Sequence, residues 1–189
     1  MVDPQLLAPE RIRPLKRVEY DRMVDAGLFV DERIELLRGV LVEMSPQGTG
    51  HADAVARMLR LCYEQLGRAY EIRPQLPFAA SDDSEPEPDV MISPRGDYRK
   101  AHPERALLLI EVADSSLTKD RRIKAAIYAE VGVPEYWIVA VPAEEIEILS
   151  ERMDGEYRAR RVVGRDGVAV SQAVPGLAVS VEELFGEPR

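Results

Sequence analysis

The first third of the chain combines a helical spacing of hydrophobic positions with two short apolar runs. Apolar residues recur at helical spacing over residues 16–26, and Gly27 is suited to end that helix. The apolar-rich runs 33–37 and 40–44 are separated by an Arg-Gly dipeptide, which is typical of a β-hairpin. After a polar loop, helical periodicity returns over residues 51–66. We therefore expect a docking helix, a hairpin and a longer amphipathic helix.

The middle of the chain contains two runs that are apolar without alternation. Residues 106–112 and 136–141 have the composition of central strands buried on both faces. Between them, residues 118–131 show helical periodicity, and Gly132 and Pro134 are stop signals. A strand, helix and strand in this order predict a right-handed parallel crossover.

The remaining elements are shorter and are read from alternation and turn residues. We expect strands at 70–72, 76–79 and 89–92, a second hairpin from 146–149 and 157–163 around Asp154-Gly155, and a terminal helical turn at 181–185. The chain shows neither an internal repeat nor a linker. These elements predict a single α/β domain over residues 1–189, with a core at 16–148 and a C-terminal hairpin and tail at 149–189.

Composition supports a globular protein that can bury a core. Of the 189 residues, 46% are hydrophobic and 31% are charged. The longest apolar runs fall far short of the roughly 20 residues of a membrane-spanning helix. Residues 1–14 lack the apolar stretch of a signal peptide. We expect a soluble, cytoplasmic protein without a membrane partner.

Charge and the scarcity of two residue types narrow the possible chemistry. The chain has 25 Lys and Arg against 34 Asp and Glu, a net charge of −9, which disfavours broad attraction to nucleic acid but permits a local basic patch. The single cysteine, Cys62, excludes an internal disulfide framework and a Cys-rich zinc site. Two histidines, His51 and His102, are too few for a His-rich metal cage. Any metal would have to bind to carboxylates.

Glu111 is the most informative acidic residue because it interrupts a fully apolar strand. A buried carboxylate is costly unless it is paired, hydrogen-bonded or bound to a metal. Asp89 begins another strand after Pro88, and a separation of 22 residues allows neighbouring strands to bring both carboxylates to one end of a sheet. Two close carboxylates repel, so that one pKa rises or a divalent cation offsets the charge. Oxygen ligands favour Mg²⁺ or Mn²⁺.

Lys124 lies on the helix that follows the Glu111 strand. A lysine near a scissile phosphate can orient water and offset developing negative charge, so Asp89, Glu111 and Lys124 form a candidate set for phosphodiester cleavage. Simpler interpretations remain open. Asp89 could be an ordinary turn residue, Glu111 and Lys124 could form a structural ion pair, and Lys124 could pair with Asp120 on the helix surface.

Several motifs occur in a consistent order along the chain. They are RIELLRG at residues 33–39, EMSP at 43–46, SEPEPD at 84–89, LLLIEVADSSL at 107–117, DRRIK at 120–124 and YAEVGVPEYWIV at 128–139. This series resembles the Uma-type family of bacterial restriction endonucleases, which belongs to the PD-(D/E)xK nuclease-like superfamily. The resemblance covers about residues 18–148. It implies a restriction-endonuclease-like fold, a mixed central sheet flanked by helices with an N-terminal helix and a C-terminal β-hairpin.

The resemblance also assigns roles to residues. Asp89 matches the motif aspartate, and Glu111 matches the acid of the E-x-K element. Alanine occupies the usual lysine position, 113, and Lys124 is similar to a relocated lysine on the following helix. Glu35 resembles an acid contributed from the N-terminal part of the core, and His51 lies where the family often has a histidine near the metal or its water. Glu35 could equally be an outward strand residue, and His51 could simply begin its helix.

The leading hypothesis is a Mg²⁺- or Mn²⁺-dependent endodeoxyribonuclease. In it Asp89 and Glu111 ligate the metal, Lys124 positions the nucleophile, and Glu35 and His51 assist. One alternative is a nuclease-like domain that binds nucleic acid or a protein partner without cutting, and another is a nuclease acting on RNA. A homodimer is possible because the C-terminal hairpin could offer an apolar edge.

Two basic clusters are expected to flank the site. The first contains Arg99 and Lys100, and the second contains Lys119 and Arg121. We predict that these residues contact substrate phosphates, although solvated surface charges are the simpler interpretation.

Overall fold

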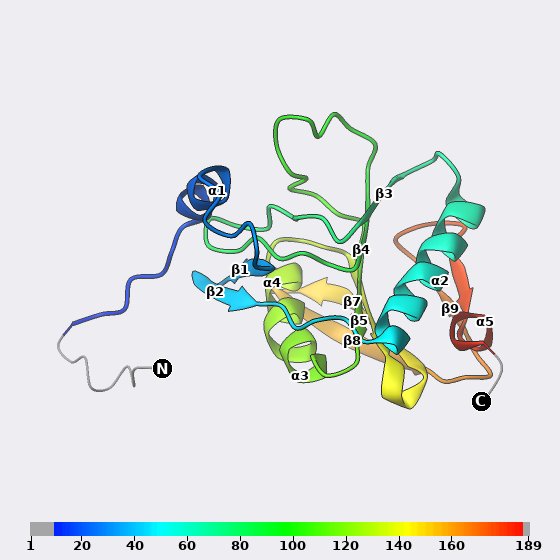
Figure 1. The fold of residues 1–189 in the computed structure, drawn as a ribbon. Helices are drawn as coiled ribbons and strands as arrows, with labels where there is room; N and C mark the ends of the chain where they lie inside the picture. Colours follow the sequence, from blue (N-terminus) through cyan, green and yellow to red (C-terminus); the bar gives the residue numbers. More distant parts are fainter. Residues whose placement is uncertain (1–9, 187–189) are drawn as a thin grey trace.

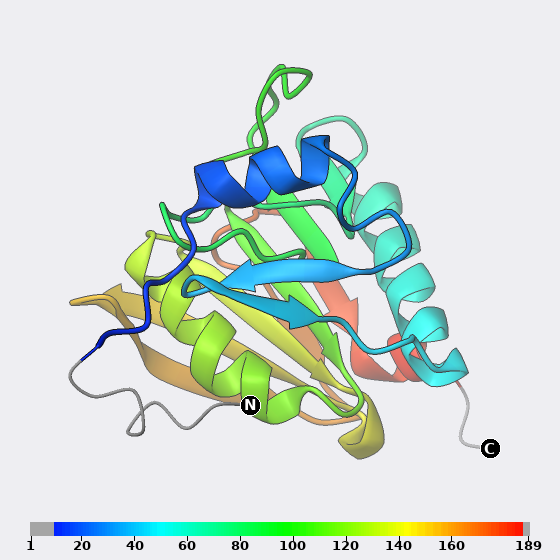
Figure 2. The ribbon, with the colours of Figure 1, turned by 60° about the vertical axis from the view of Figure 1, so that its left-hand side comes forward.

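The computed structural model describes residues 10–186, which form a mixed six-stranded sheet with helices on both faces (Figures 1 and 2). The strand order is β3-β4-β5-β6-β7-β8, and within it β5 and β6 are parallel whereas the other neighbours are antiparallel. The elements are α1 (Arg17–Asp25), β1 (Ile34–Leu37), β2 (Val40–Glu43), α2 (Thr49–Leu66), β3 (Glu71–Pro74), β4 (Val90–Ser93), β5 (Leu108–Ala113), α3 (Leu117–Lys119), the π-helical turn η2 (Asp120–Lys124), α4 (Ala125–Glu130), β6 (Glu135–Ala140), the 3-10 turn η3 (Val141–Ala143), β7 (Glu145–Met153), β8 (Glu156–Val163), β9 (Val168–Val170), β10 (Ala178–Ser180) and α5 (Val181–Phe185).

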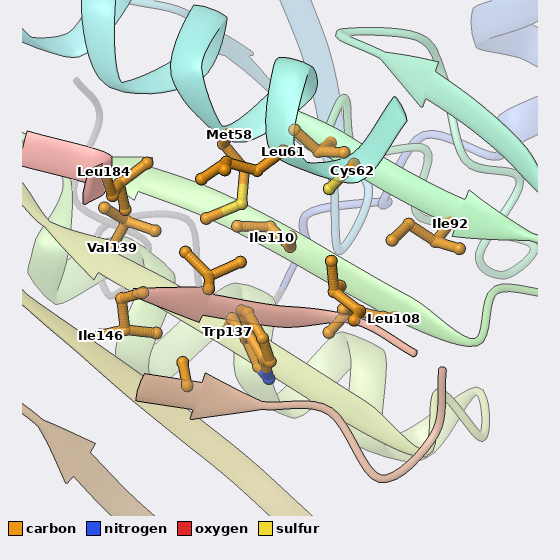
Figure 3. Close-up of a cluster of buried hydrophobic side chains, with 14 of the residues drawn as sticks. Met58, Leu61, Cys62, Ile92, Leu108, Ile110, Trp137, Val139, Ile146 and Leu184 are labelled. Atoms are coloured by element: carbon orange, nitrogen blue, oxygen red, sulfur yellow. The ribbon is translucent and has the colours of Figure 1, made fainter. Parts of the chain in front are cut away.

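The two faces of the sheet bury separate hydrophobic clusters. Successive strand residues point to opposite faces, so Ile110 and Trp137 join one cluster while Leu109 and Tyr136 join the other. Helix α2, β9, β10 and α5 complete the first cluster (Figure 3). Helix α4 and the β1–β2 hairpin lie on the second face. Odd-numbered residues of β5 therefore face α4.

The predicted crossover and both predicted hairpins are present. β5 and β6 pair in parallel and are connected through α3, η2 and α4. The turns at Arg38-Gly39 and Asp154-Gly155 have positive φ at both residues, 53° and 73° in the first and 53° and 75° in the second. Positive φ at both central residues defines a type I′ turn, which matches the twist of paired strands.

Four features of the structure differ from the sequence prediction. Residues 76–79 form no strand, and Phe78 and Ala79 instead donate backbone hydrogen bonds to Pro86 and Pro103. The β9–β10 hairpin is missing from the sequence prediction because each strand has three residues. The hairpin of β7 and β8 belongs to the central sheet, and β7 runs across the expected core boundary at residue 148. The outer strand β8 is not an apolar edge, since Arg158, Arg160 and Arg161 are exposed on it.

Helix α2 covers the first face of the sheet and places the single cysteine inside the core. Met58, Leu61 and Cys62 point toward the strands from successive turns of this helix (Figure 3). Burial raises the pKa of the Cys62 thiol to about 12, so the thiol is retained as a small apolar core group. Between residues 10 and 186 we find no helix with the length and apolar character needed to cross a membrane.

Candidate active site

The register of β4 and β5 brings two predicted acids together. Val90 pairs with Ile110 and Met91 with Leu109 in an antiparallel ladder, and Asp89 and Glu111 are the next residues beyond the last pair. Both side chains are on the sheet face that α4 covers, because each has the parity of its buried neighbours Met91 and Leu109. The spacing of 22 residues therefore brings both carboxylates to one end of neighbouring strands, where they line the same cavity.

Glu111 is held by a lysine and a tyrosine from the helix that follows its strand. Its Oε1 accepts hydrogen bonds from Lys124 Nζ at 2.9 Å and from the Tyr128 hydroxyl at 2.7 Å. The three residues are at most 4% exposed. Burial raises the pKa of Glu111 despite the nearby Lys124, and Asp120 and Asp89 raise it further. Burial alone would lower the pKa of Lys124, but its carboxylate neighbours raise it, so the ammonium form is retained.

Glu35 forms ion pairs with two lysines, and one of them, Lys124, also contacts Glu111. Its Oε1 accepts from Lys119 Nζ at 2.7 Å and its Oε2 lies 2.9 Å from Lys124 Nζ. Burial works to raise the pKa of Glu35, but the two ammonium groups outweigh it and the pKa is lowered. In a regular α-helix, residues five apart point roughly 140° away from each other. The π-helical turn η2 starts directly after Lys119 and ends at Lys124, and both lysines reach one carboxylate.

Asp89 is held in place by hydrogen bonds from three elements. Its Oδ2 accepts from the Val112 backbone N–H at 2.8 Å and lies 3.3 Å from His51 Nε2, and its Oδ1 accepts from Gln75 Nε2 at 3.1 Å. Burial opposes ionisation of Asp89, but these donors prevail and lower its pKa. The hydrogen bond with Asp89 raises the pKa of His51. The other ring nitrogen of His51, Nδ1, is buried without a partner among the described residues.

These groups line an open cavity of about 280 Å³. It lies between the end of β2 with the loop that follows, the start of α2, and the segment formed by α3 and η2. Among the described residues its lining includes six carboxylate side chains but three Lys or Arg side chains, Arg33, Lys119 and Lys124. Such an excess of acid in a concave site attracts cations.

The donor set fits a hard divalent cation bound by few protein ligands. Within residues 10–186 we find no cluster of three or more His, Cys, Asp or Glu side chains arranged around a common metal position. Mg²⁺ commonly binds through one or two carboxylates and keeps several waters or substrate phosphate oxygens. Asp89 and Glu111 supply two carboxylates at the cavity wall, which meets that requirement.

The structure sorts the predicted site residues into three groups. Asp89, Glu111, Lys124, His51 and Lys119 line the cavity, whereas Glu35 lies behind it and contacts the lysines. The surface-pair interpretation of Lys124 is wrong, because its side chain is 2% exposed. Arg121 lies outside the cavity lining and pairs with Glu147 on β7.

The first basic cluster does not flank the cavity as expected. Asp89 precedes β4, whereas the loop that carries Arg99 and Lys100 follows the opposite end of that strand. Four strand residues span roughly 13 Å. In both ribbon views this loop projects from the end of the sheet away from α3 (Figures 1 and 2). Arg99 is 87% exposed at its side chain and pairs with Asp97.

Two residues at the site were not predicted from the sequence. Tyr128 lies one turn after Lys124, and this helical spacing could have identified it as a second partner of Glu111. Gln75 follows β3 with φ at 47°, in the left-handed region, and directs its amide to Asp89. A glutamine in this conformation has no local sequence signal. A non-glycine residue with positive φ is common at functional sites.

Comparison with known proteins supports a nuclease-type fold. The family model Uma2, described as "Putative restriction endonuclease", matches residues 18–182. A crystal structure from Anabaena variabilis ATCC 29413, described as a putative nuclease belonging to DUF820, is similar at 15% sequence identity with a TM-score of 0.72. The alignment covers 91% of this chain and 98% of that one. The search of curated proteins found no match.

Proposed function

The chain belongs to the Uma2 restriction endonuclease family, and from that premise and the cavity geometry we propose that it is a metal-dependent endonuclease hydrolysing phosphodiester bonds of DNA. The observation that carries the proposal is that Asp89 and Glu111 line one open cavity at the same end of neighbouring strands, with Lys124 Nζ 2.9 Å from Glu111. Two carboxylates beside an ammonium group are suited to hold a cation and a phosphate together. The mixed sheet and its nuclease-type neighbour are consistent with this function.

Asp89 and Glu111 would hold Mg²⁺ or Mn²⁺. When bound, the ion supplies Lewis-acid polarisation of a phosphoryl oxygen and makes water more acidic. The protein contributes by fixing the carboxylates before the ion arrives. Asp89 is fixed by Val112, His51 and Gln75, and Glu111 by Lys124 and Tyr128. Ligands fixed by neighbouring hydrogen bonds need little reorganisation on binding.

Lys124 is suited to position the nucleophile and offset negative charge. An ammonium group has three N–H donors, and two of them point to Glu111 and Glu35. The third is available to the cavity that Lys124 lines, where it can hold water or a phosphate oxygen. Glu35 acts as a positioning residue because it contacts Lys119 and Lys124 and lies outside the cavity lining. His51 positions Asp89 in the same way.

A plasmid-nicking assay with Mg²⁺ or Mn²⁺ tests this proposal. We expect Asp89→Asn and Glu111→Gln to lower the cleavage rate by about 1000-fold or more, because each removes a charge on which transition-state stabilisation depends. Glu64→Gln, on the exposed surface of α2, is the matched control and should cleave like the wild type. Equal activity in all four proteins would refute the assignment of Asp89 and Glu111.

Comparing substrates separates the remaining alternatives. Duplex DNA, single-stranded DNA and RNA are offered under the same conditions, and the proposal requires duplex DNA to be cut. Cleavage confined to RNA would replace the DNA substrate with RNA while keeping the site. Binding of nucleic acid without cleavage under any metal condition would identify a domain that binds without cutting.

A further inference from the structure

A buried carboxylate on β7 holds two arginines that come from different elements. Glu147 is fully buried, and its Oε1 accepts from Arg121 Nε at 2.9 Å and also from Arg121 Nη2. Its Oε2 accepts from Arg160 Nε at 2.8 Å. Arg121 comes from the turn η2, and Arg160 comes from the edge strand β8. Burial works to raise the pKa of Glu147, but the hydrogen bonds from Arg160 and Arg121 outweigh it.

The cluster exposes guanidinium nitrogens that Glu147 does not bind. Two guanidinium groups face one carboxylate, and their side chains are 40% and 52% exposed. In the described part of the chain, Arg121 uses Nε and Nη2 and Arg160 uses Nε. Nη1 of Arg121 and both terminal nitrogens of Arg160 are therefore available to another acceptor. Glu145, on the same strand, also lies close enough to raise the pKa of Arg160, so the exposed guanidinium nitrogens, and not an unbalanced charge, indicate a further acceptor.

The cluster lies beside the cavity, on the other side of the helical segment. Lys119 reaches Glu35 and the cavity, while Arg121, two residues later, reaches β7 in the other direction. Helix α4 packs against β8, which brings the edge strand to this segment. In Figure 2 the helical segment lies between the β1–β2 hairpin and the β7–β8 strands. Arg122 and Arg158 are exposed on the same two elements.

We propose that Arg121 and Arg160, held in place by Glu147, bind the phosphodiester backbone of the DNA duplex beside the scissile position. This inference rests on the proposed function. The guanidinium group is planar and always charged, and it binds phosphate oxygens through two parallel N–H groups. A carboxylate that fixes the Nε side of each group directs the remaining nitrogens outward. A net charge of −9 makes such a local basic surface necessary for any polyanionic substrate.

Binding of a fluorescent DNA duplex, measured by anisotropy in EDTA so that cleavage does not occur, tests the inference. We expect Arg121→Gln and Arg160→Gln each to weaken binding about tenfold at low salt, as for the loss of one charged hydrogen bond. Each should also reduce the slope of log K against log salt by about 0.9. Arg160→Lys should restore most of the salt slope because it keeps the charge.

Stability controls accompany the binding measurements. A variant that lacks both arginines would leave Glu147 buried without a partner. That variant therefore also carries Glu147→Gln, and its urea unfolding is compared with that of the wild type. Arg60→Gln on α2 removes an exposed arginine elsewhere, with a side chain 54% exposed, and should leave the affinity unchanged. Wild-type affinity and salt slope in folded Arg121→Gln and Arg160→Gln would overturn the inference while leaving cleavage at Asp89 and Glu111 intact. Failure of the wild type to bind DNA would overturn both this inference and the proposed function.

Discussion

At the scale of single residues, Glu85 is a buried carboxylate outside the candidate site. It is 4% exposed, its Oε2 has no hydrogen-bond partner among the described residues, and Arg17 Nη1 lies 3.8 Å from that oxygen. Burial raises the pKa of Glu85 to about 7, and Asp21 and Glu87 add to this effect while Arg17 opposes it. The folded state therefore favours protonated Glu85. This stabilisation is complete below the unfolded pKa of about 4.5 and is lost as the pH rises to about 7.

Glu85→Gln should consequently change how stability depends on pH. The neutral amide resembles the protonated acid, so the variant should match the wild type near pH 4.5 and exceed its free energy of unfolding by on the order of 1–3 kcal/mol at pH 8. Urea unfolding at several pH values measures this difference. Glu104→Gln is the control, because Glu104 approaches the same Arg17 but is 73% exposed. A difference between Glu85→Gln and wild type that does not vary with pH would contradict the argument.

Tyr128 gives a second prediction at this scale. Its hydroxyl donates to Glu111 from a fully buried position, and Tyr128→Phe would remove that donor without changing the packing of the ring. We expect a loss of about 1.5–3 kcal/mol in the free energy of unfolding, as for a hydrogen bond to a charged group. Tyr136→Phe is the control, because Tyr136 is equally buried and its hydroxyl makes only a long bond of 3.4 Å to Asp120. An equal loss in both variants in urea unfolding would show that the hydrogen bond to Glu111 contributes no more to the free energy of unfolding than the long bond of Tyr136.

Whether a site residue can be predicted from the sequence depends on whether its signal is local or comes from contacts with distant parts of the chain. Asp89, Glu111 and Lys124 could be identified because a charge in an apolar strand and a motif are local signals. Glu147 could not be identified in that way, since its arginine partners come from residues 26 positions before it and 13 positions after it. The role of Glu35 as a partner of two lysines also depends on contacts 84 or more positions away.

At the scale of elements, Glu135 attaches the β9–β10 hairpin region to the central sheet. Its Oε2 accepts from the backbone N–H groups of Gln172 and Ala173 at 2.8 and 2.9 Å, and Trp137 Nε1 donates to its Oε1 at 2.5 Å. Glu135→Ala would leave these donors without their acceptor. We expect a loss of about 2–4 kcal/mol in the free energy of unfolding.

Hydrogen exchange separates this attachment from a general loss of stability. The amide protons of Gln172 and Ala173 should exchange faster in Glu135→Ala. The exchange rates of the β5 amide protons should change only as far as the global stability changes. Glu156→Ala, at an exposed position on β8, is the control. Unchanged protection at Gln172 and Ala173 would refute the role assigned to Glu135.

The elements that could be predicted are those with strong periodicity or strong turn residues. The long helix α2, the buried strands β5 and β6, and both type I′ hairpins have such signals. The turn η2 does not, because a helical pattern over residues 118–131 is equally compatible with a regular α-helix. Residues 76–79 were assigned wrongly because Phe78 and Ala79 are buried while their backbone N–H groups bond to loop residues, and Leu76 is 40% exposed.

At the scale of the whole molecule, composition gives the amount of acid but not its location. A net charge of −9 disfavours binding of nucleic acid when it is treated as evenly distributed. The folded chain instead gathers six carboxylates at one cavity and places Arg121 and Arg160 beside it. The fold therefore separates an acidic cavity from a basic surface, and neither could be located from residue counts.

This separation predicts that divalent cations stabilise the folded protein through Asp89 and Glu111. A ligand that binds the folded state alone adds about 2.7 kcal/mol at 100 times its Kd. For a domain of this size that corresponds to a rise in Tm of roughly 5–10 °C. Thermal unfolding with Mg²⁺ or Mn²⁺, at ionic strength matched with NaCl, should show the rise, and EDTA should reverse it.

The variants decide whether the stabilisation belongs to the proposed site. Asp89→Asn and Glu111→Gln should each lose most of the metal-dependent rise in Tm, because each variant removes one of the two carboxylates proposed to bind the ion directly. Glu64→Gln should keep the full rise, since its exposed side chain on α2 lies outside the cavity lining. A rise of the same size in all of these proteins would show that the cations bind elsewhere on the acidic surface, and the metal ligands of the proposed endonuclease would then have to be sought among other carboxylates.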